Sequence, residues 1–421
     1  MADLILTAAA IAGMAGLASL RPRTCLYILL AILPTQFLFV PVSTFFISPA
    51  DVMVVGSGAA FAIRLLRGRP DAIRSARQHV WAGAMILGYV LGGLLSGHFS
   101  RTVVRIGLSV VPSVLIGELV RERTHFARAS TALVISAALD AGFAFWLYAN
   151  GVPLYPDRFS GVAGPNFSAI FLTVGATIAL TRLAQSPPAR VLALPGALGA
   201  LALATLSKMA ALGLAVGGLM ALPLVTRRNR VVLAAAAAIL VAGALSTGTV
   251  RDRIRARFEP AMQNDGIRRT STELRWSMME AAMRGFAEHP LTGLGYGRFQ
   301  QYSLTHPEIL GATAGRGFGT HNTYLEVLVE GGLLAFVPFV LHFGFLRRAL
   351  AVYRAAVSSG DTVGAATVAG LPAILLCAAL INMLLHYSLW AVIGIALAAS
   401  RTQSAADAAV QPAAPPRQVA S

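Results

Sequence analysis

The chain has 421 residues, of which 56% are hydrophobic and only 12% are charged, and an ordinary soluble domain carries about twice that share of charge. This composition excludes a typical soluble protein and indicates an all-α integral membrane protein. The net charge of +16 comes mostly from arginines in short clusters between apolar runs. Such clusters are typical of cytoplasmic helix ends, so we expect no nucleic-acid partner.

Apolar segments long enough to span a bilayer predict about 12 or 13 transmembrane helices. The first segment, residues 4–20, has no positive flank before it and no cleavage site after it, so it predicts a membrane helix rather than a cleaved signal. The Ala- and Pro-rich tail, residues 403–421, is typical of disorder. In chain order the segments are 4–20, 25–47, 50–66, 80–97, 102–120, 129–149, 166–184, 190–206, 209–225, 231–247, 322–346, 363–384 and 386–400.

Arginine clusters recur after every second segment, so all of them can lie on the cytoplasmic side with helical hairpins between them. The clusters fall within residues 64–77, 121–128, 182–190, 227–230 and 347–354. The remaining connections then lie on the external side. They are the loop near His98, residues 150–165, the turn at Ser207–Lys208, residues 249–320 and the turn near His386. The side of the N-terminus stays open, because residues 4–20 can form a full span or a half-helix.

This pattern divides the chain into a transmembrane bundle over residues 1–248, an external loop domain over 249–320 and transmembrane helices over 321–402. The loop domain contains one predicted helix, from Thr270 to Glu288, with a capping box formed by Thr270 and Glu273. One face of this helix is apolar, so we expect it to pack on the membrane domain or to lie at the interface. That face carries Leu274, Met278, Ala281 and Ala282.

Three basic residues on the predicted external side each allow two interpretations. Arg158 comes just before a Gly-rich turn, and it is either an interfacial loop residue or a guanidinium that binds phosphate groups bidentately. Lys208, the only lysine of the chain, either extends to the membrane surface or lines a polar cavity. Arg275, next to Trp276, lies either on a solvated helix face or in a binding site.

The stretch HNTYLEVLVEGG begins an apolar helix with polar residues. Asn322, Glu326 and Glu330 are spaced by four residues and therefore share one helix face. Two carboxylates facing lipid would be costly, so this face is predicted to look into the protein or into a wet cavity. His321, at the water boundary, is a structural residue or a general base, and nearby arginines would keep its imidazole neutral. Gly331–Gly332 indicates close helix packing.

The sequence RWSMMEAAMRGFAEHPLTGLGYGRF, followed after a short stretch by THNTYLEVLVEGGLLAF, resembles the C-terminal signature of the O-antigen ligase and O-antigen polymerase superfamily. The strongest part of the resemblance covers residues 275–336. The RFSG and GPN turn at 158–166 and the many apolar segments extend the resemblance over most of the chain.

The resemblance implies an all-helical glycosyltransferase of the kind compared with the GT-C class, in the bacterial inner membrane with its active site on the periplasmic side. Its substrate would be a glycan on undecaprenyl diphosphate within the lipid membrane. Its acceptor would be lipid A-core or a second lipid-linked glycan. The resemblance also implies that the enzyme needs no nucleotide sugar, no cofactor and, for a ligase, no metal.

The resemblance further implies roles for individual residues. The family's catalytic histidine falls on His321, with Asn322, Glu326 and Glu330 as supporting residues. The family's diphosphate-binding arginines fall on Arg158 and Arg275. The family often has Ser-Arg where this chain has Ser207–Lys208, and lysine keeps the charge but loses the bidentate fork.

Ligases and polymerases share these motifs, so both functions stay open, and the ligase is preferred only slightly. A transporter or flippase is a further alternative. It predicts polar residues through the depth of several helices and opposed half-sites. In this sequence the polar residues gather on one side of the predicted membrane domain, which favours a one-sided active site.

Overall fold

The structure is a computed structural model. It describes residues 2–410 apart from 39, 43–44, 99, 101, 153, 155–158, 163, 249–250, 253–254, 256–258, 260, 263–267 and 314–316. Helices make up most of this part of the chain, and the only strands within it are two short antiparallel pairs. The prediction of an all-α membrane protein is therefore confirmed.

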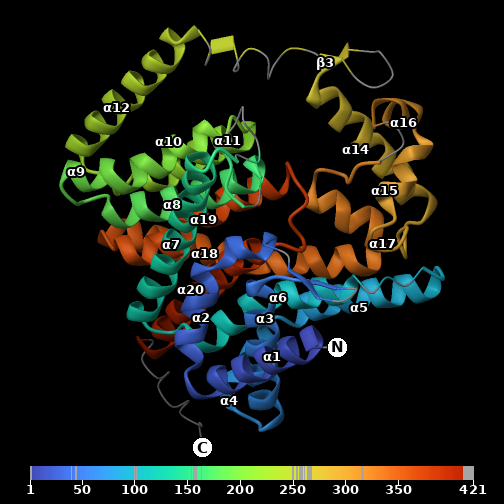
Figure 1. Ribbon diagram of the computed structural model, residues 1–421. Coiled ribbons are helices and arrows are strands. Elements are labelled where there is room, and N and C mark those ends of the chain that lie inside the picture. Colours follow the sequence, from blue (N-terminus) through green and yellow to red (C-terminus); the bar gives the residue numbers. More distant parts are fainter. Residues whose placement is uncertain are drawn as a thin grey trace, which may run out of the picture.

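The N-terminal half of the chain forms a bundle of eight α-helices (Figure 1). A short helix η1 (Leu33–Phe37) and the strands β1 (Val40–Val42) and β2 (Phe45–Ile47) connect the second helix to the third. The helices are α1 (Ala2–Leu20), α2 (Pro22–Ala31), α3 (Pro49–Leu66), α4 (Pro70–Gln78), α5 (Val80–Leu95), α6 (Val103–Leu119), α7 (Arg123–Ala149) and α8 (Pro165–Leu183).

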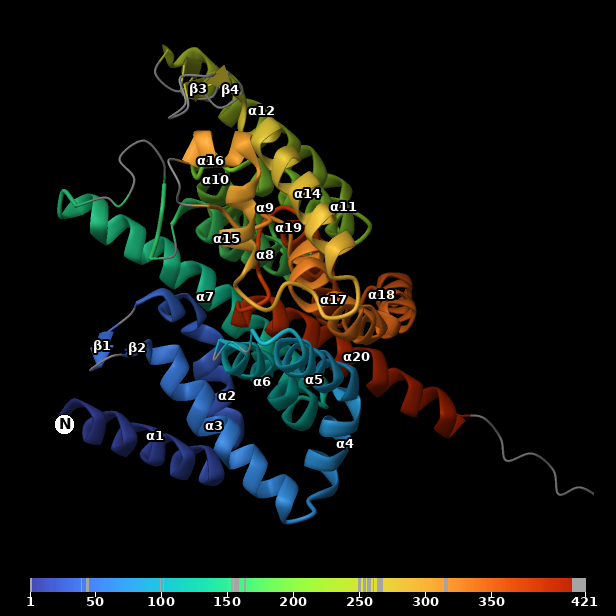
Figure 2. The same cartoon turned by 90° about the vertical axis from the view of Figure 1, so that its right-hand side faces the viewer.

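The C-terminal half adds a second group of helices, and α14 to α16 gather at one end of α17 (Figures 1 and 2). Its elements are α9 (Pro188–Val191), η2 (Leu192–Gly196), α10 (Ala197–Ala204), α11 (Lys208–Ala221), α12 (Arg227–Ser246), β3 (Ala261–Met262), β4 (Arg268–Arg269), α14 (Ser271–Glu288), α15 (Phe299–Tyr302), η3 (Ser303–Thr305), α16 (Pro307–Thr313), α17 (Thr323–His342), η4 (Phe343–Phe345), α18 (Leu346–Ser359), α19 (Thr362–Ala378) and α20 (Tyr387–Val410).

Four helical stretches in the described chain are long and apolar enough to cross a membrane: α3, α7, α8 and the run Thr323–Ser359. The pair α4 and α5, bent by 59°, raises this number to five. The expected 12 or 13 spans go beyond this number, because several apolar segments form helices of only 10–17 residues. Residues 25–47 differ most from expectation: α2 ends at Ala31, since Pro34 and Pro41 lack the N–H groups that a continuing helix needs.

Polar contacts join the connections that carry the arginine clusters. Arg123 at the start of α7 bonds to Asp361 before α19 over 2.7 Å, and Asn229 at the start of α12 donates to the carbonyl group of Ala184 at the end of α8 over 2.9 Å. At the other end of the bundle, Ser207 donates to Asn166 over 3.3 Å. These contacts are as expected if the helices run as hairpins between two polar faces.

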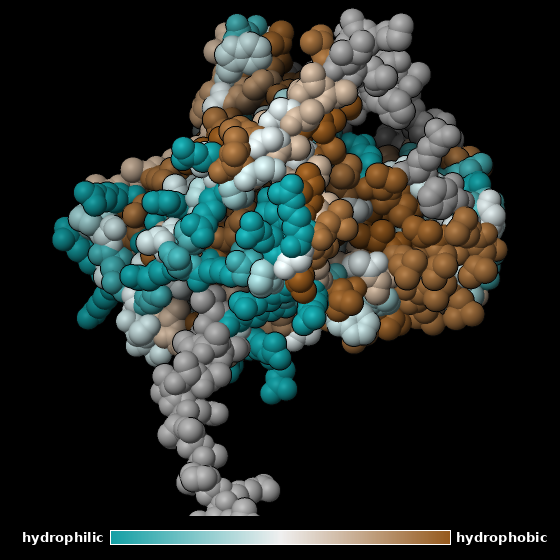
Figure 3. Space-filling model, turned by 90° about the horizontal axis from the view of Figure 1, so that it is seen from below, coloured by the Kyte–Doolittle hydropathy of each residue, from teal (hydrophilic) through white to brown (hydrophobic). Residues whose placement is uncertain are grey.

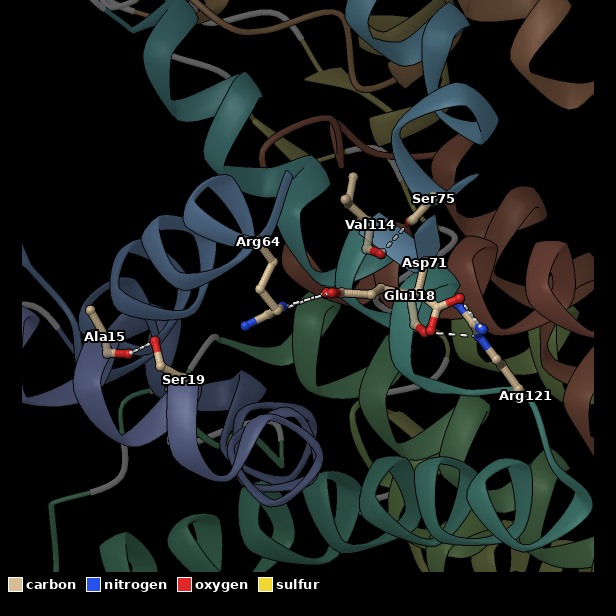
Figure 4. A network of polar contacts seen from close by, with 8 residues as sticks. All are labelled: Ala15, Ser19, Arg64, Asp71, Ser75, Val114, Glu118 and Arg121. Carbon is tan, nitrogen blue, oxygen red and sulfur yellow. Dashed lines mark hydrogen bonds and ion pairs between the residues drawn. The ribbon is translucent and has the colours of Figure 1, made fainter. Parts of the chain in front are cut away.

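Figure 4 shows a network of polar contacts that joins α3, α4 and α6. Arg64 binds Glu118 with two parallel hydrogen bonds of 2.6 and 2.7 Å, and Arg121 bonds to Asp71. Glu118 is buried at the end of α6, and the guanidinium of Arg64 pairs with its carboxylate there. Ser75 of α4 adds a hydrogen bond of 2.6 Å to the carbonyl oxygen of Val114.

The helix α17 is broken inside its apolar run. Gly332 has φ 58° and ψ −166°, and its neighbours find backbone partners in the loop after α14. The N–H of Leu294 donates to the carbonyl group of Val329 over 2.9 Å, and the N–H of Leu333 donates to that of Pro290 over 2.9 Å. A broken helix in a membrane needs such partners, because an unpaired backbone group is costly there. The loop at 290–295 supplies them.

The surface is divided between polar and apolar regions. In the view from below, hydrophilic residues gather over the left and centre of the face, whereas hydrophobic residues cover its right-hand part (Figure 3). Large apolar side chains such as Leu66, Leu95 and Ile239 are also exposed in the described chain. An exposed apolar surface of this kind is what a multi-pass membrane protein presents to lipid.

Candidate active site

The candidate site is built around the amino end of α17. Asn322 is the N-cap of this helix, and its Oδ1 accepts the N–H groups of Tyr324 over 2.9 Å and Leu325 over 3.1 Å. The side chain of Asn322 therefore satisfies two of the helix's free donors. Its supporting role is structural: it fixes where the helix begins, directly after His321.

His321 has φ 50°, one of two residues other than glycine with a positive φ in the described chain. Such a conformation costs about 1–2 kcal/mol for a residue with a side chain, and histidine tolerates it better than most residues. Strain of this kind persists where the surrounding structure imposes it, and it gathers at functional sites. The backbone thus turns sharply at His321 before the helix starts.

The imidazole of His321 is half-buried, and its ring centroid lies 5.9 Å from that of Phe318. Burial, followed by the charge of the nearby Arg275, lowers the pKa of His321 to about 4. The ring is therefore neutral at pH 7, with a free nitrogen that can accept a proton. The shift has the direction expected for a histidine near an arginine, and the roles of both residues stay predictions.

Arg275 belongs to α14, which begins with the predicted capping box. The Thr270 hydroxyl accepts the N–H of Glu273 over 3.1 Å, and the Glu273 carboxylate accepts the N–H of Thr270. Met278, Ala281 and Ala282 are buried in a cluster with Phe299, Ile309 and Val329. The predicted apolar face thus packs on α17 and its neighbours, and Arg275 of the same helix lies close enough for its charge to act on His321. Burial lowers the pKa of Arg275 from its ordinary value.

Glu326 and Glu330 point into the protein, as their shared helix face predicts. Both are buried, and each has one carboxylate oxygen, Oε2, without a partner in the described chain. The Oε1 of Glu330 accepts the N–H of Phe299 over 3.1 Å. The rings of Tyr89 and Tyr296 lie edge to face at 5.5 Å, close enough to both carboxylates for their charges to act on Tyr296, and burial with these charges raises its pKa.

Gly331 has the role that its sequence suggested. A Cβ at this position would lie 2.9 Å from the Tyr89 ring, so the glycine permits close packing between α17 and α5. Its neighbour Gly332 has a second role that the sequence did not reveal, since it makes the break in α17.

Two predicted site residues are not joined to this group by the structure. Lys208 is the first residue of α11, which packs on α8 and α19, and it has an interaction partner of its own. Figure 1 shows α11 near the middle of the view and α14 to its right. Arg158 lies outside the described residues. The roles of both residues in binding diphosphate stay predictions.

A cavity of about 480 Å³ lies beside the loop after α14, rather than at His321. Its lining includes none of the predicted site residues. It is lined by Leu95, Ser96, His98, His289, Thr292, Gly293, Leu294, Arg298, Gln301, Tyr302 and Thr305.

Sequence reasoning missed the partners that come from distant parts of the chain. Tyr89, which belongs to α5, lies near the two glutamates of α17. Asn382, in the connection between α19 and α20, contacts the turn at His321. Each is a single polar residue in an apolar stretch, a weak signal that points to buried polar contacts but not to which ones.

Residues 193–340 match the family model described as O-antigen ligase. The matched residues make up about a third of the chain, and the match supports the resemblance to the O-antigen ligase and polymerase superfamily. The matched region contains Lys208, Arg275, His321, Glu326 and Glu330, whereas Arg158 and Asn382 lie outside it. No curated protein matches the chain. The match supports a ligase-like or polymerase-like function on glycans.

Proposed function

We propose that the protein is a glycosyltransferase that moves an undecaprenyl-diphosphate-linked glycan onto an acceptor hydroxyl. The acceptor is lipid A-core, which makes the enzyme an O-antigen ligase. Polymerisation of O-antigen or exopolysaccharide repeats is the alternative, since both activities occur in the superfamily. The enzyme lies in the bacterial inner membrane with its site on the periplasmic side. Residues 249–320 form its external part, between the transmembrane parts 1–248 and 321–402.

The observation that supports this function best is the neutral His321 beside Arg275, within the O-antigen ligase match. An unprotonated imidazole can remove a proton from a hydroxyl at pH 7, which is worth roughly 10²–10⁴-fold in rate. A guanidinium near that base suits the phosphate groups of the donor.

The chemistry needs little more than these groups. His321 takes the proton of the acceptor hydroxyl while the oxygen attacks the anomeric carbon of the donor glycan. The bond from that carbon to the diphosphate oxygen breaks, and its electron pair leaves with the diphosphate. Arg275 stabilises the charge that develops there, and Arg158 and Lys208 are the further candidates for this task. The proposed reaction requires no metal and no cofactor.

The test is deletion of the gene in its own host, followed by complementation with the wild-type chain or with His321→Ala. Lipopolysaccharide and undecaprenyl-linked glycan are then resolved on gels. We expect the deletion strain to show bare core while long lipid-linked chains accumulate, and we expect only the wild-type chain to reverse this. His321→Ala should reach the membrane in normal amount.

Other outcomes would change the proposal. Core that carries a single repeat, with no long chains in either fraction, would identify a polymerase. Unchanged lipopolysaccharide in the deletion strain would move the same chemistry to another surface glycan. Full complementation by His321→Ala would exclude His321 as the base.

A further inference from the structure

The connection between α19 and α20, residues 379–386, holds the turn that carries His321. The Oδ1 of Asn382 accepts the backbone N–H of Asn322 over 2.9 Å. The hydroxyl of Thr320 lies 3.0 Å from the same oxygen and 2.8 Å from the carbonyl oxygen of Asn322, so its single proton can serve either. Asn382 therefore contacts the residues on both sides of His321.

A second pair of hydrogen bonds fixes the next residue to the same connection. The hydroxyl of Thr323 donates to the carbonyl group of Ile381 over 2.8 Å and accepts the N–H of Met383 over 2.8 Å. Thr323 is fully buried, so these bonds are shielded from water. Residues 381–383 and 320–323 thus form one rigid unit, although about 60 residues separate them in the sequence.

Asn382 lies between the turn at His321 and Glu326. Its Oδ1 accepts the Asn322 N–H, so its amide group lies on the other side, toward the buried carboxylate of Glu326. Gly319 packs closely on this amide group, because a Cβ at that position would lie 2.6 Å from the Asn382 amide nitrogen. The amide therefore has little free space around it.

Two features show why this hold matters at His321. Its positive φ is unfavourable for a residue with a side chain, so the turn would relax without external bonds. Among the described residues the imidazole has a ring contact with Phe318 but no hydrogen bond. The direction of the ring therefore depends on the backbone turn, which is held through Asn322 and Thr320.

We propose that Asn382 is the positioning residue for His321, with Glu326 holding Asn382 in place. This inference rests on the proposed role of His321 as the base. It assigns to Glu326 an action through Asn382 rather than on the imidazole, and it adds a residue from outside the matched family region. A misplacement of about 1 Å in a reacting group can cost 100-fold in rate.

The test measures glycan transfer by the purified, full-length protein in nanodiscs, with lipid-linked glycan as donor. Asn382→Ala should lower kcat about 100-fold, while KM for the donor stays within about threefold, since Arg275 is untouched. Asn150→Ala is the matched control, because Asn150 bonds only to Trp146 within its own helix. It should keep wild-type kcat.

A double-mutant cycle distinguishes a positioning role of Asn382 from a merely structural one. In a His321→Ala background, a positioning residue has nothing left to aim, so adding Asn382→Ala should not lower the residual rate further. Additive losses in the two variants would overturn the proposal. If Asn382→Ala does not fold, Thr320→Val and Thr320→Ser replace it. We expect Thr320→Val to lower kcat and Thr320→Ser to restore it. Equal kcat values for the two variants would contradict the proposal.

The failures of the two ideas are distinguishable. Wild-type activity in His321→Ala would remove the proposed base, and the positioning role would fall with it. An inactive His321→Ala together with a near-wild-type kcat in Asn382→Ala would overturn the positioning role alone and leave the proposed function intact.

Discussion

At the scale of single residues, the turn at His321 is held by a residue from a distant connection, Asn382. The shared face of Glu326 and Glu330 followed from their spacing, and both residues are buried. The charge of Arg275 acts on His321, although 46 residues separate the two in the sequence. The contact with Asn382 could not be predicted, because helix periodicity says nothing about which distant loop reaches a helix end. The strain at His321 was equally hidden, since a histidine in a sequence shows no φ angle.

The charge of Arg275 leads to a prediction about pH. The pKa of His321 is lowered to about 4, first by burial and then by Arg275. The base is active when unprotonated, so kcat/KM should hold down to about pH 5 and fall as the pH drops through the pKa. In Arg275→Gln the like-charge repulsion on His321 is gone, so the pH at which kcat/KM falls should rise by roughly half a unit. It should stay below the ordinary pKa of histidine, because burial remains.

Arg275→Lys is the matched variant, since it keeps the charge but loses the fork. The pH at which its kcat/KM falls should stay near that of the wild type, although its activity at pH 7 is lower. The measurement is kcat/KM of each variant from pH 3.5 to 8. If kcat/KM of Arg275→Gln falls at the same pH as that of the wild type, Arg275 does not act on His321.

At the scale of elements, the ends of α14 were predictable and the break in α17 was not. The capping box and the apolar face of α14 are local patterns, and both are confirmed. The break depends on two glycines that are far apart in the sequence. A Cβ at Gly332 would lie 2.3 Å from the carbonyl oxygen of Leu291, and one at Gly293 would lie 2.5 Å from that of Glu330. The sequence shows both glycines but not that they meet.

Gly332→Ala should therefore be strongly destabilising. The left-handed φ alone costs about 1–2 kcal/mol for alanine, and the clash with Leu291 adds to this cost. Gly344→Ala in the same helical run is the control, because a Cβ there meets no atom within 4 Å. Thermal unfolding in nanodiscs checks the difference. Equal melting temperatures for the two variants would mean that the break is not fixed by backbone conformation.

At the scale of the whole molecule, composition alone was sufficient to assign an all-α membrane protein. The number of spans was less predictable, because apolar length does not show where a proline or glycine ends a helix, as Pro34 does after α2. The contacts between connections agree with the hairpin pattern: Arg123 reaches Asp361, and Ser207 reaches Asn166. Which polar face is external follows from the arginine bias and is open to direct test.

Cysteine labelling can test the sidedness, since Cys25 and Cys377 are both buried. Thr272→Cys at the exposed start of α14 should react with a membrane-impermeant maleimide in intact spheroplasts. Arg74→Cys, exposed on α4, should react only after the membrane is opened. Reversed labelling would place the His321 site in the cytoplasm.

The broken helix α17 also has a consequence for protein engineering. The loop at 290–295 supplies the backbone partners of Val329, Glu330, Leu333 and Leu334, so the loop and the helix behave as one exchangeable cassette. A chimera with a similar protein, joined between residues 296 and 328, would combine a loop from one parent with a helix from the other. Joints placed before Pro290 and after Leu334 keep these backbone hydrogen bonds within one parent.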